Sequence, residues 1–102
     1  MLFFKTNKVT DEFARQLAVD LAKRYPVAVD LDATKKRNPS RLANAFDSTF
    51  NRAINFQLEH KLGVYGKAKL IAAYKSELEA LGYPNDFVDL ATSAMTKFVG
   101  SN

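Results

Sequence analysis

The sequence contains no cysteine and only one histidine, His60. Without cysteine the chain has no disulfide framework, no thiolate metal site and no cysteine nucleophile. A single histidine also excludes a catalytic histidine pair and a histidine metal cluster. We therefore expect no catalytic residues, no metal site and no cofactor, and nothing in the sequence indicates a small-molecule substrate.

Long apolar runs are missing as well. The apolar start of the chain, residues 1–4, is interrupted by Lys5 and Lys8. It is far shorter than the apolar core of a signal peptide or the roughly 20 residues of a membrane span. The sequence predicts a soluble, unprocessed protein in the cytoplasm, without a membrane partner.

What the chain does have is enough apolar surface for one core. It has 102 residues, of which 47% are hydrophobic, including eight phenylalanines and four tyrosines. This predicts a single domain over residues 1–102. Apolar residues recur at helical spacing in four segments with short connections, which predicts an all-α fold, a four-helix antiparallel bundle. The expected helices span residues 10–25, 39–62 and 67–81, and a last one runs from the turn at 83–85 to residue 99.

Capping signals support these boundaries. Thr10 is the expected cap of the first helix, and Asn38 followed by Pro39 is a strong opening for the second. Gly63 is expected to end that helix in the left-handed conformation, and Gly82 ends the next one.

Two short segments are expected to be strands. Val27, Val29 and Leu31 alternate with smaller or polar residues, and residues 2–5 could pair with them in a two-stranded ribbon over 2–5 and 27–31. The following run, Asp30-Leu31-Asp32-Ala33-Thr34, resembles the D-x-D-x-T motif of the haloacid-dehalogenase phosphotransferases, which use the first Asp as nucleophile and bind magnesium. That family requires a doubly wound parallel sheet, for which this chain has neither the strands nor the length, so we expect no enzyme.

The most informative feature is a polar stripe on the helix that begins at Pro39. Its residues recur at steps of three and four, so they share one helix face. Asn and Ser are poorer helix formers than the Lys and Glu of an ordinary solvated face, which suggests a surface that touches a partner. The alternatives are a plain solvated face and an amide layer packed inside the fold. The stripe consists of Arg41, Asn44, Ser48, Asn51, Asn55 and Glu59.

Charge is unevenly distributed along the chain. Residues 35–75 hold nine basic and two acidic residues, a net charge of +7, within a chain of net charge +4. Such a segment could meet phosphate groups or an acidic protein, although folding could also scatter these charges.

The sequence therefore leaves two functions open. The first is a small non-catalytic protein-binding module, of regulatory or adaptor type, whose partner is another protein or a second copy of the chain. Its expected site is Arg41, Asn44, Ser48, Asn51, Arg52 and Asn55. The alternative is a nucleic-acid-binding protein that uses Lys35, Lys36, Arg37, Arg41 and Arg52.

Overall fold

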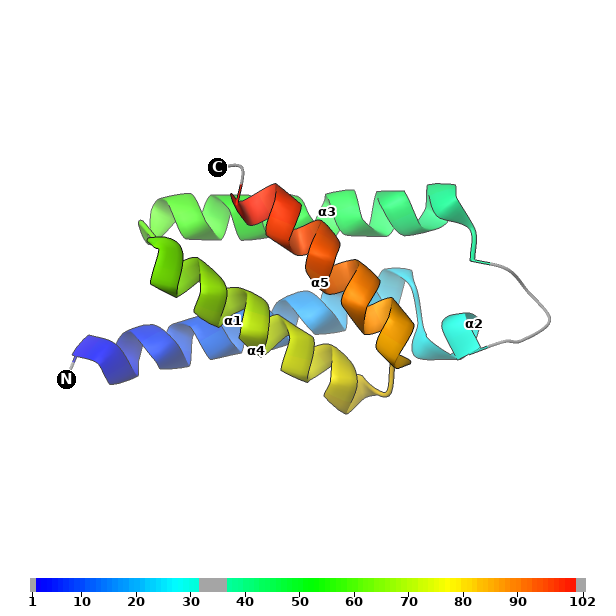
Figure 1. The fold of residues 1–102 in the computed structure, drawn as a ribbon, viewed down its shortest axis with the longest axis horizontal. Helices are drawn as coiled ribbons and strands as arrows, with labels where there is room; N and C mark the ends of the chain where they lie inside the picture. Colours follow the sequence, from blue (N-terminus) through cyan, green and yellow to red (C-terminus); the bar gives the residue numbers. More distant parts are fainter. Residues whose placement is uncertain (1, 32–36, 101–102) are drawn as a thin grey trace.

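A computed structural model describes residues 2–31 and 37–100, with side chains from residue 8 onward (Figure 1). The described part is all-α, as expected, and its elements are helices. The helices are α1 (Leu2–Arg24), α2 (Val27–Leu31), α3 (Pro39–Glu59), α4 (Val64–Leu81) and α5 (Asn85–Gly100).

The four long helices form two layers. α1 and α3 run side by side in opposite directions, and α4 and α5 cross them obliquely on one side (Figure 1). α1 packs on α4, α4 on α5, and α5 on α3. The short helix α2 lies at the same end of the molecule as the turn between α4 and α5 (Figure 1).

Aromatic rings join the two layers. Phe50 of α3 is fully buried, and its ring stacks on that of Phe46 with centroids 5.1 Å apart. The rings of Tyr74 from α4 and Phe98 from α5 meet Phe50 edge-on at 5.9 and 5.3 Å. Leu17 of α1 is buried in the same cluster. Large apolar residues at helical spacing therefore form the buried face of these helices.

The expected two-stranded ribbon is wrong. Residues 2–5 belong to α1, which begins at Leu2, and residues 27–31 form α2. Thr10 is buried within α1 rather than capping it, and no Pro or Gly before it interrupts the helix. In α2 the amides of Val29 and Asp30 donate to the Pro26 carbonyl, so an alternating pattern of five residues is here a single helical turn.

The end of α3 also differs from the expectation. Asn38 caps its start as predicted, accepting a hydrogen bond from the Arg41 amide at 3.1 Å. α3 ends at Glu59, however, and the left-handed residue is Lys61, with φ of 52°, while Gly63 precedes α4 with φ of −84°.

α4 begins earlier than expected, at Val64. A Cβ on Gly66 would lie 3.1 Å from the Leu62 side chain, so any other residue at this position would require Leu62 to shift by a few tenths of an ångström. Leu62 is half-buried against the core, whereas Leu58, four residues earlier, is 55% exposed. Residues spaced four apart shift around the helix axis at each step. Leu58 therefore no longer lies on the buried face of α3.

The core also contains a hydroxyl without a partner. The Tyr74 hydroxyl is buried and makes no hydrogen bond within the described structure, and burial raises its pKa. The buried Tyr83 hydroxyl, in contrast, donates to the Tyr25 carbonyl at 2.5 Å. An unpaired buried hydroxyl carries a desolvation cost that a paired one does not.

We therefore expect Tyr74→Phe to leave the free energy of unfolding unchanged or raise it by up to about 1 kcal/mol. The matched variant, Tyr83→Phe, loses a hydrogen bond and should lower it by about 1 kcal/mol. Urea unfolding of both variants measures the difference. A clear loss of stability in Tyr74→Phe would mean that its hydroxyl is hydrogen-bonded.

Candidate functional site

The polar stripe is exposed along the whole of α3. All six of its residues face solvent, on the side opposite the buried row of Leu42, Phe46, Phe50 and Ala53. An amide layer inside the fold is therefore excluded. The stripe is either a solvated face or a contact surface.

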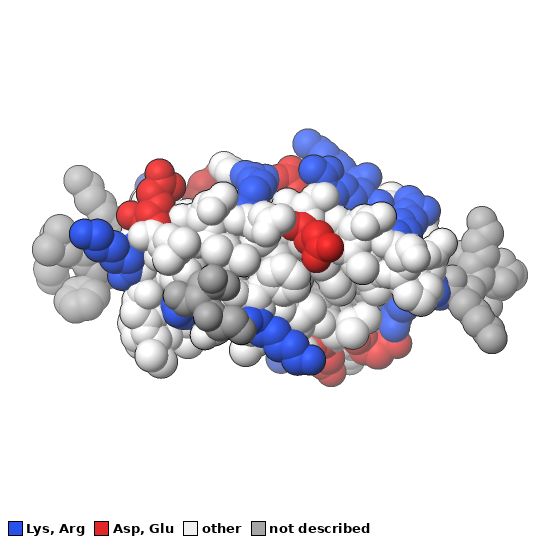
Figure 2. All heavy atoms as spheres, turned by 90° about the horizontal axis from the view of Figure 1, so that it is seen from above, with Lys and Arg blue, Asp and Glu red and all other residues white. Residues whose placement is uncertain are grey.

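This exposed face carries little net charge. It has two basic residues, Arg41 and Arg52, and two acidic residues, Asp47 and Glu59, so its net charge is zero. Figure 2 looks down on α3 and shows a surface that is mostly uncharged, with basic side chains gathered towards the end where α3 begins. The linear segregation of charge in the sequence thus does not produce one continuous basic patch over α3.

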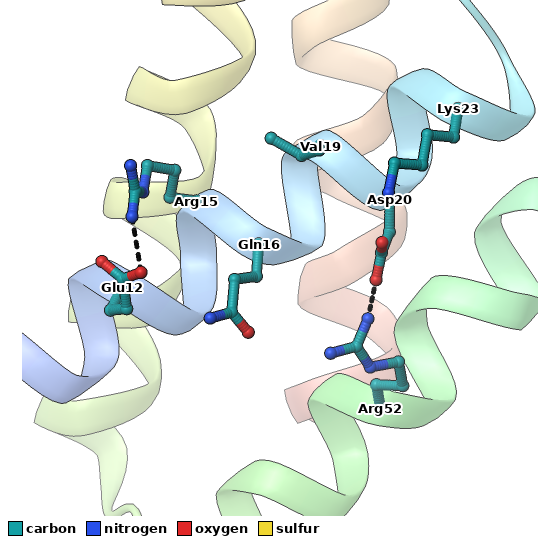
Figure 3. A pocket seen from close by; sticks show the side chains of 7 residues that line it. All are labelled: Glu12, Arg15, Gln16, Val19, Asp20, Lys23 and Arg52. Carbon is teal, nitrogen blue, oxygen red and sulfur yellow. Dashed lines mark hydrogen bonds and ion pairs between the residues drawn. The ribbon is translucent and has the colours of Figure 1, made fainter.

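A furrow follows the seam between α1 and α3 beside the stripe. It consists of three hollows in succession, with volumes of about 460, 480 and 520 Å³. The first is lined mainly by apolar side chains, among them Val9, Phe13 and Phe56. The second is lined by charged and polar residues of α1 together with Arg52, and α4 and α5 lie behind α1 in this view (Figure 3). The third joins the end of α1 to the first turns of α3.

Ion pairs hold the two arginines of the middle hollow. Arg52 pairs with Asp20 across the furrow, and Arg15 pairs with Glu12 one turn away at 2.5 Å (Figure 3). The Arg52 guanidinium also lies over the ring of Phe13, 5.9 Å from its centroid. The Phe13 ring in turn stacks on the Phe56 ring, with centroids 4.0 Å apart, so two packed aromatic rings form the bottom of the furrow at this point.

The third hollow has a different charge pattern. It is lined by Arg24 of α1 and by Arg41 near the start of α3, and none of the described residues that line it is acidic. Its other lining residues are small or carry amide and hydroxyl groups: Asn38, Ser40, Asn44, Ala45 and Ser48. We call this the arginine hollow.

Arg37 lies elsewhere and is used inside the fold. Its guanidinium donates two hydrogen bonds to the Asp30 carboxylate, at 2.6 and 2.9 Å, and contacts Asp86 of α5 at 3.1 Å. The Tyr25 hydroxyl donates to the same carboxylate at 2.7 Å. The Asp30 side chain is fully buried, and the Arg37 hydrogen bonds hold its pKa below the usual range. Burial and the neighbouring Asp30 raise the pKa of Tyr25 to about 12.

The structure thus brings together only part of each predicted site. All six residues of the predicted protein-binding site lie on the exposed side of α3: Arg41, Asn44, Ser48, Asn51, Arg52 and Asn55. Arg41, Asn44 and Ser48 line the arginine hollow and Arg52 lines the middle hollow, whereas Asn51 and Asn55 are not among the lining residues. Of the predicted nucleic-acid site, Arg37 and Arg52 are paired with acids, and Lys35 and Lys36 lie outside the described residues.

The sequence does not predict that α1 lines the furrow, because the residue spacing along one helix does not show which other helix lies beside it. Lys23, Arg24 and Asp20 give the furrow much of its charge. The basic pair at residues 23–24, at the end of a predicted helix, was the only available signal.

Comparison with models of known protein families gives no match, and comparisons with curated proteins and with solved structures give none. Among the described residues, no helix is both long and apolar enough to span a bilayer. Over the same residues there is no group of three or more metal-ligating side chains.

The buried pair of Asp30 and Arg37 predicts a dependence of stability on pH. A carboxyl with a lowered pKa in the folded state stabilises the fold above its unfolded pKa, about 3.9, and that contribution is lost as the pH falls through the folded pKa. Asp30→Asn should therefore lower the free energy of unfolding by about 1–3 kcal/mol at pH 7. The difference from the wild type should shrink below about pH 4.

Denaturant unfolding at pH 7, 4 and 3 tests this, with Asp47→Asn as the control because Asp47 is exposed on α3. A constant difference between Asp30→Asn and the wild type across these pH values would contradict the prediction.

Proposed function

We propose that this protein is a small non-catalytic protein-binding module, of regulatory or adaptor type. Its partner docks along the exposed side of α3, on Arg41, Asn44, Ser48, Asn51, Arg52 and Asn55. In this proposal the four long helices act as an antiparallel four-helix bundle, a rigid scaffold that presents one uncovered side.

The observation that carries the proposal is the exposure of an amide and hydroxyl surface along one helix. Asn44, Ser48, Asn51 and Asn55 all face solvent, where Lys or Glu would favour the helix more. Short side chains lose less conformational entropy than Lys or Glu when a partner immobilises them. Their amides can donate and accept hydrogen bonds with a peptide backbone.

The charge balance favours a protein over a nucleic acid. The exposed side of α3 has two cations and two anions, and one of those cations, Arg52, is already paired with Asp20. A phosphate backbone needs several unpaired cations in succession. The carboxylates of the middle hollow also face guanidinium groups, an arrangement suited to docking rather than to acid–base chemistry.

Nucleic-acid binding through Lys35, Lys36, Arg37, Arg41 and Arg52 is the alternative, and the two arginines of the arginine hollow are the observation in its favour. It requires affinity for DNA or RNA that falls steeply with salt, because each phosphate contact releases counterions. Titration of labelled oligonucleotides at two salt concentrations decides between the two functions.

We expect the double variant Asn51→Ala, Asn55→Ala to lose its partner while remaining fully folded. Ala is the better helix former, so stability should rise by about 0.5 kcal/mol per site. Thermal unfolding measures stability. Affinity purification from the native host and sedimentation equilibrium measure association with other proteins and with a second copy.

Ser76→Ala is the matched control, because Ser76 is an exposed polar residue on α4, away from the furrow. A protein that is retained by the wild type and the control but lost from the double variant supports the proposal. If the double variant keeps every partner of the wild type and the same oligomeric state, the stripe is only a solvated face.

A further inference from the structure

We infer that the arginine hollow binds a carboxylate side chain of the protein partner, so that the partner carries an acidic residue at one end of its docking segment. This inference rests on the proposed function and names the chemistry of the partner. It follows from how the arginines of the chain are distributed between paired and unpaired positions.

The chain has five arginines, and three of them have acidic partners. Arg15 pairs with Glu12, Arg37 with Asp30 and Asp86, and Arg52 with Asp20. Among the described residues, no acid pairs with either of the other two, and both of these line the arginine hollow. Two like charges brought to one hollow repel each other, and an anion between them removes that repulsion.

The geometry holds one of these arginines in place. The Arg41 guanidinium lies over the Tyr25 ring, 5.9 Å from its centroid, and its Nη2 atom donates to the Arg24 carbonyl at 3.4 Å. These contacts leave other N–H groups of the guanidinium available, since arginine has five. An arginine that is already oriented loses less conformational freedom when it binds an anion.

The stripe beside the hollow favours a ligand whose negative charge lies at one end. Asn44 and Ser48 line the hollow and also belong to the polar stripe, which continues along α3 through the uncharged Asn51 and Asn55. Beyond Arg41 the next cation on this side is Arg52, which is paired with Asp20. Along α3 beyond Arg41 the stripe therefore adds no unpaired cation, and a peptide with one terminal acidic residue followed by uncharged residues matches both the hollow and the stripe.

The planar guanidinium fork matches a carboxylate, which it can bind through two parallel hydrogen bonds. A carboxylate on a protein side chain can therefore occupy the hollow while the rest of the segment meets the amides of the stripe. The position of the acid would fix the direction in which the partner lies along α3.

The test is a titration of ¹⁵N-labelled protein, followed by NMR at low salt, with a capped four-residue peptide of three glycines and one glutamate, and with the same peptide carrying glutamine instead as the uncharged control. We expect the glutamate peptide alone to shift the amide signals of Arg24, Asn38 and residues 40–48. Arg24→Gln and Arg41→Gln should each weaken this binding at least about fivefold, since each removes charge-assisted hydrogen bonds. Arg15→Gln, which removes an exposed arginine of α1 outside the arginine hollow, should leave the binding of the glutamate peptide unchanged.

Three outcomes would overturn the inference. One is the absence of localised shifts at millimolar peptide, and another is an equal loss of binding in Arg15→Gln. The third is tighter binding of inorganic phosphate, or of a twelve-residue thymidine oligonucleotide, at the same signals, which would identify a free anion or a nucleic acid as the ligand.

The variants also separate this inference from the proposed function. If Asn51→Ala, Asn55→Ala abolishes association while the glutamate peptide fails to bind, the docking surface stands and only the acidic chemistry is wrong. If the peptide binds through both arginines but the stripe variant keeps all its partners, the anion site stands and the proposed function is wrong.

Discussion

The buried Asp30 carboxylate is the constraint on which the rest of this structure depends. A fully buried carboxylate is tolerated only with strong partners, and Arg37 and Tyr25 supply them. Because Arg37 must reach Asp30, the chain returns to the end of α1 before α3 can begin at Asn38 and Pro39. That return places Arg41 over Tyr25 and beside Arg24, which forms the arginine hollow.

The two-layer arrangement explains why the furrow is open. α4 and α5 cover one side of α1 and α3, where the large apolar residues of both helices are buried. On the uncovered side the two helices meet through the ring stack of Phe13 and Phe56 and the ion pair of Asp20 and Arg52. Contacts between single side chains cannot fill the space between two helices, so hollows remain between them.

Features governed by local chemistry could be predicted from the sequence, and those set by distant contacts could not. The Asn38 cap, the buried row from Leu42 to Ala53 and the exposure of the polar stripe follow from helical spacing and capping. Five alternating residues fit both a strand and a helical turn, and the side-chain contacts that hold Asp30 in the α2 turn come from outside it, from Arg37 and Tyr25. The furrow could not be predicted from the sequence, because the spacing of residues along a helix does not show that α1 lies beside α3.

The packing of α1 has a consequence for synthesis on the ribosome. α1 packs more extensively on α4 than on α3, and α4 begins only at Val64. Ala14, Leu17 and Leu21 therefore remain uncovered on the nascent chain until α4 has been synthesised. The buried face of α1 can be covered only after α4 has left the exit tunnel, so α1 is expected to pack late, although it is synthesised first.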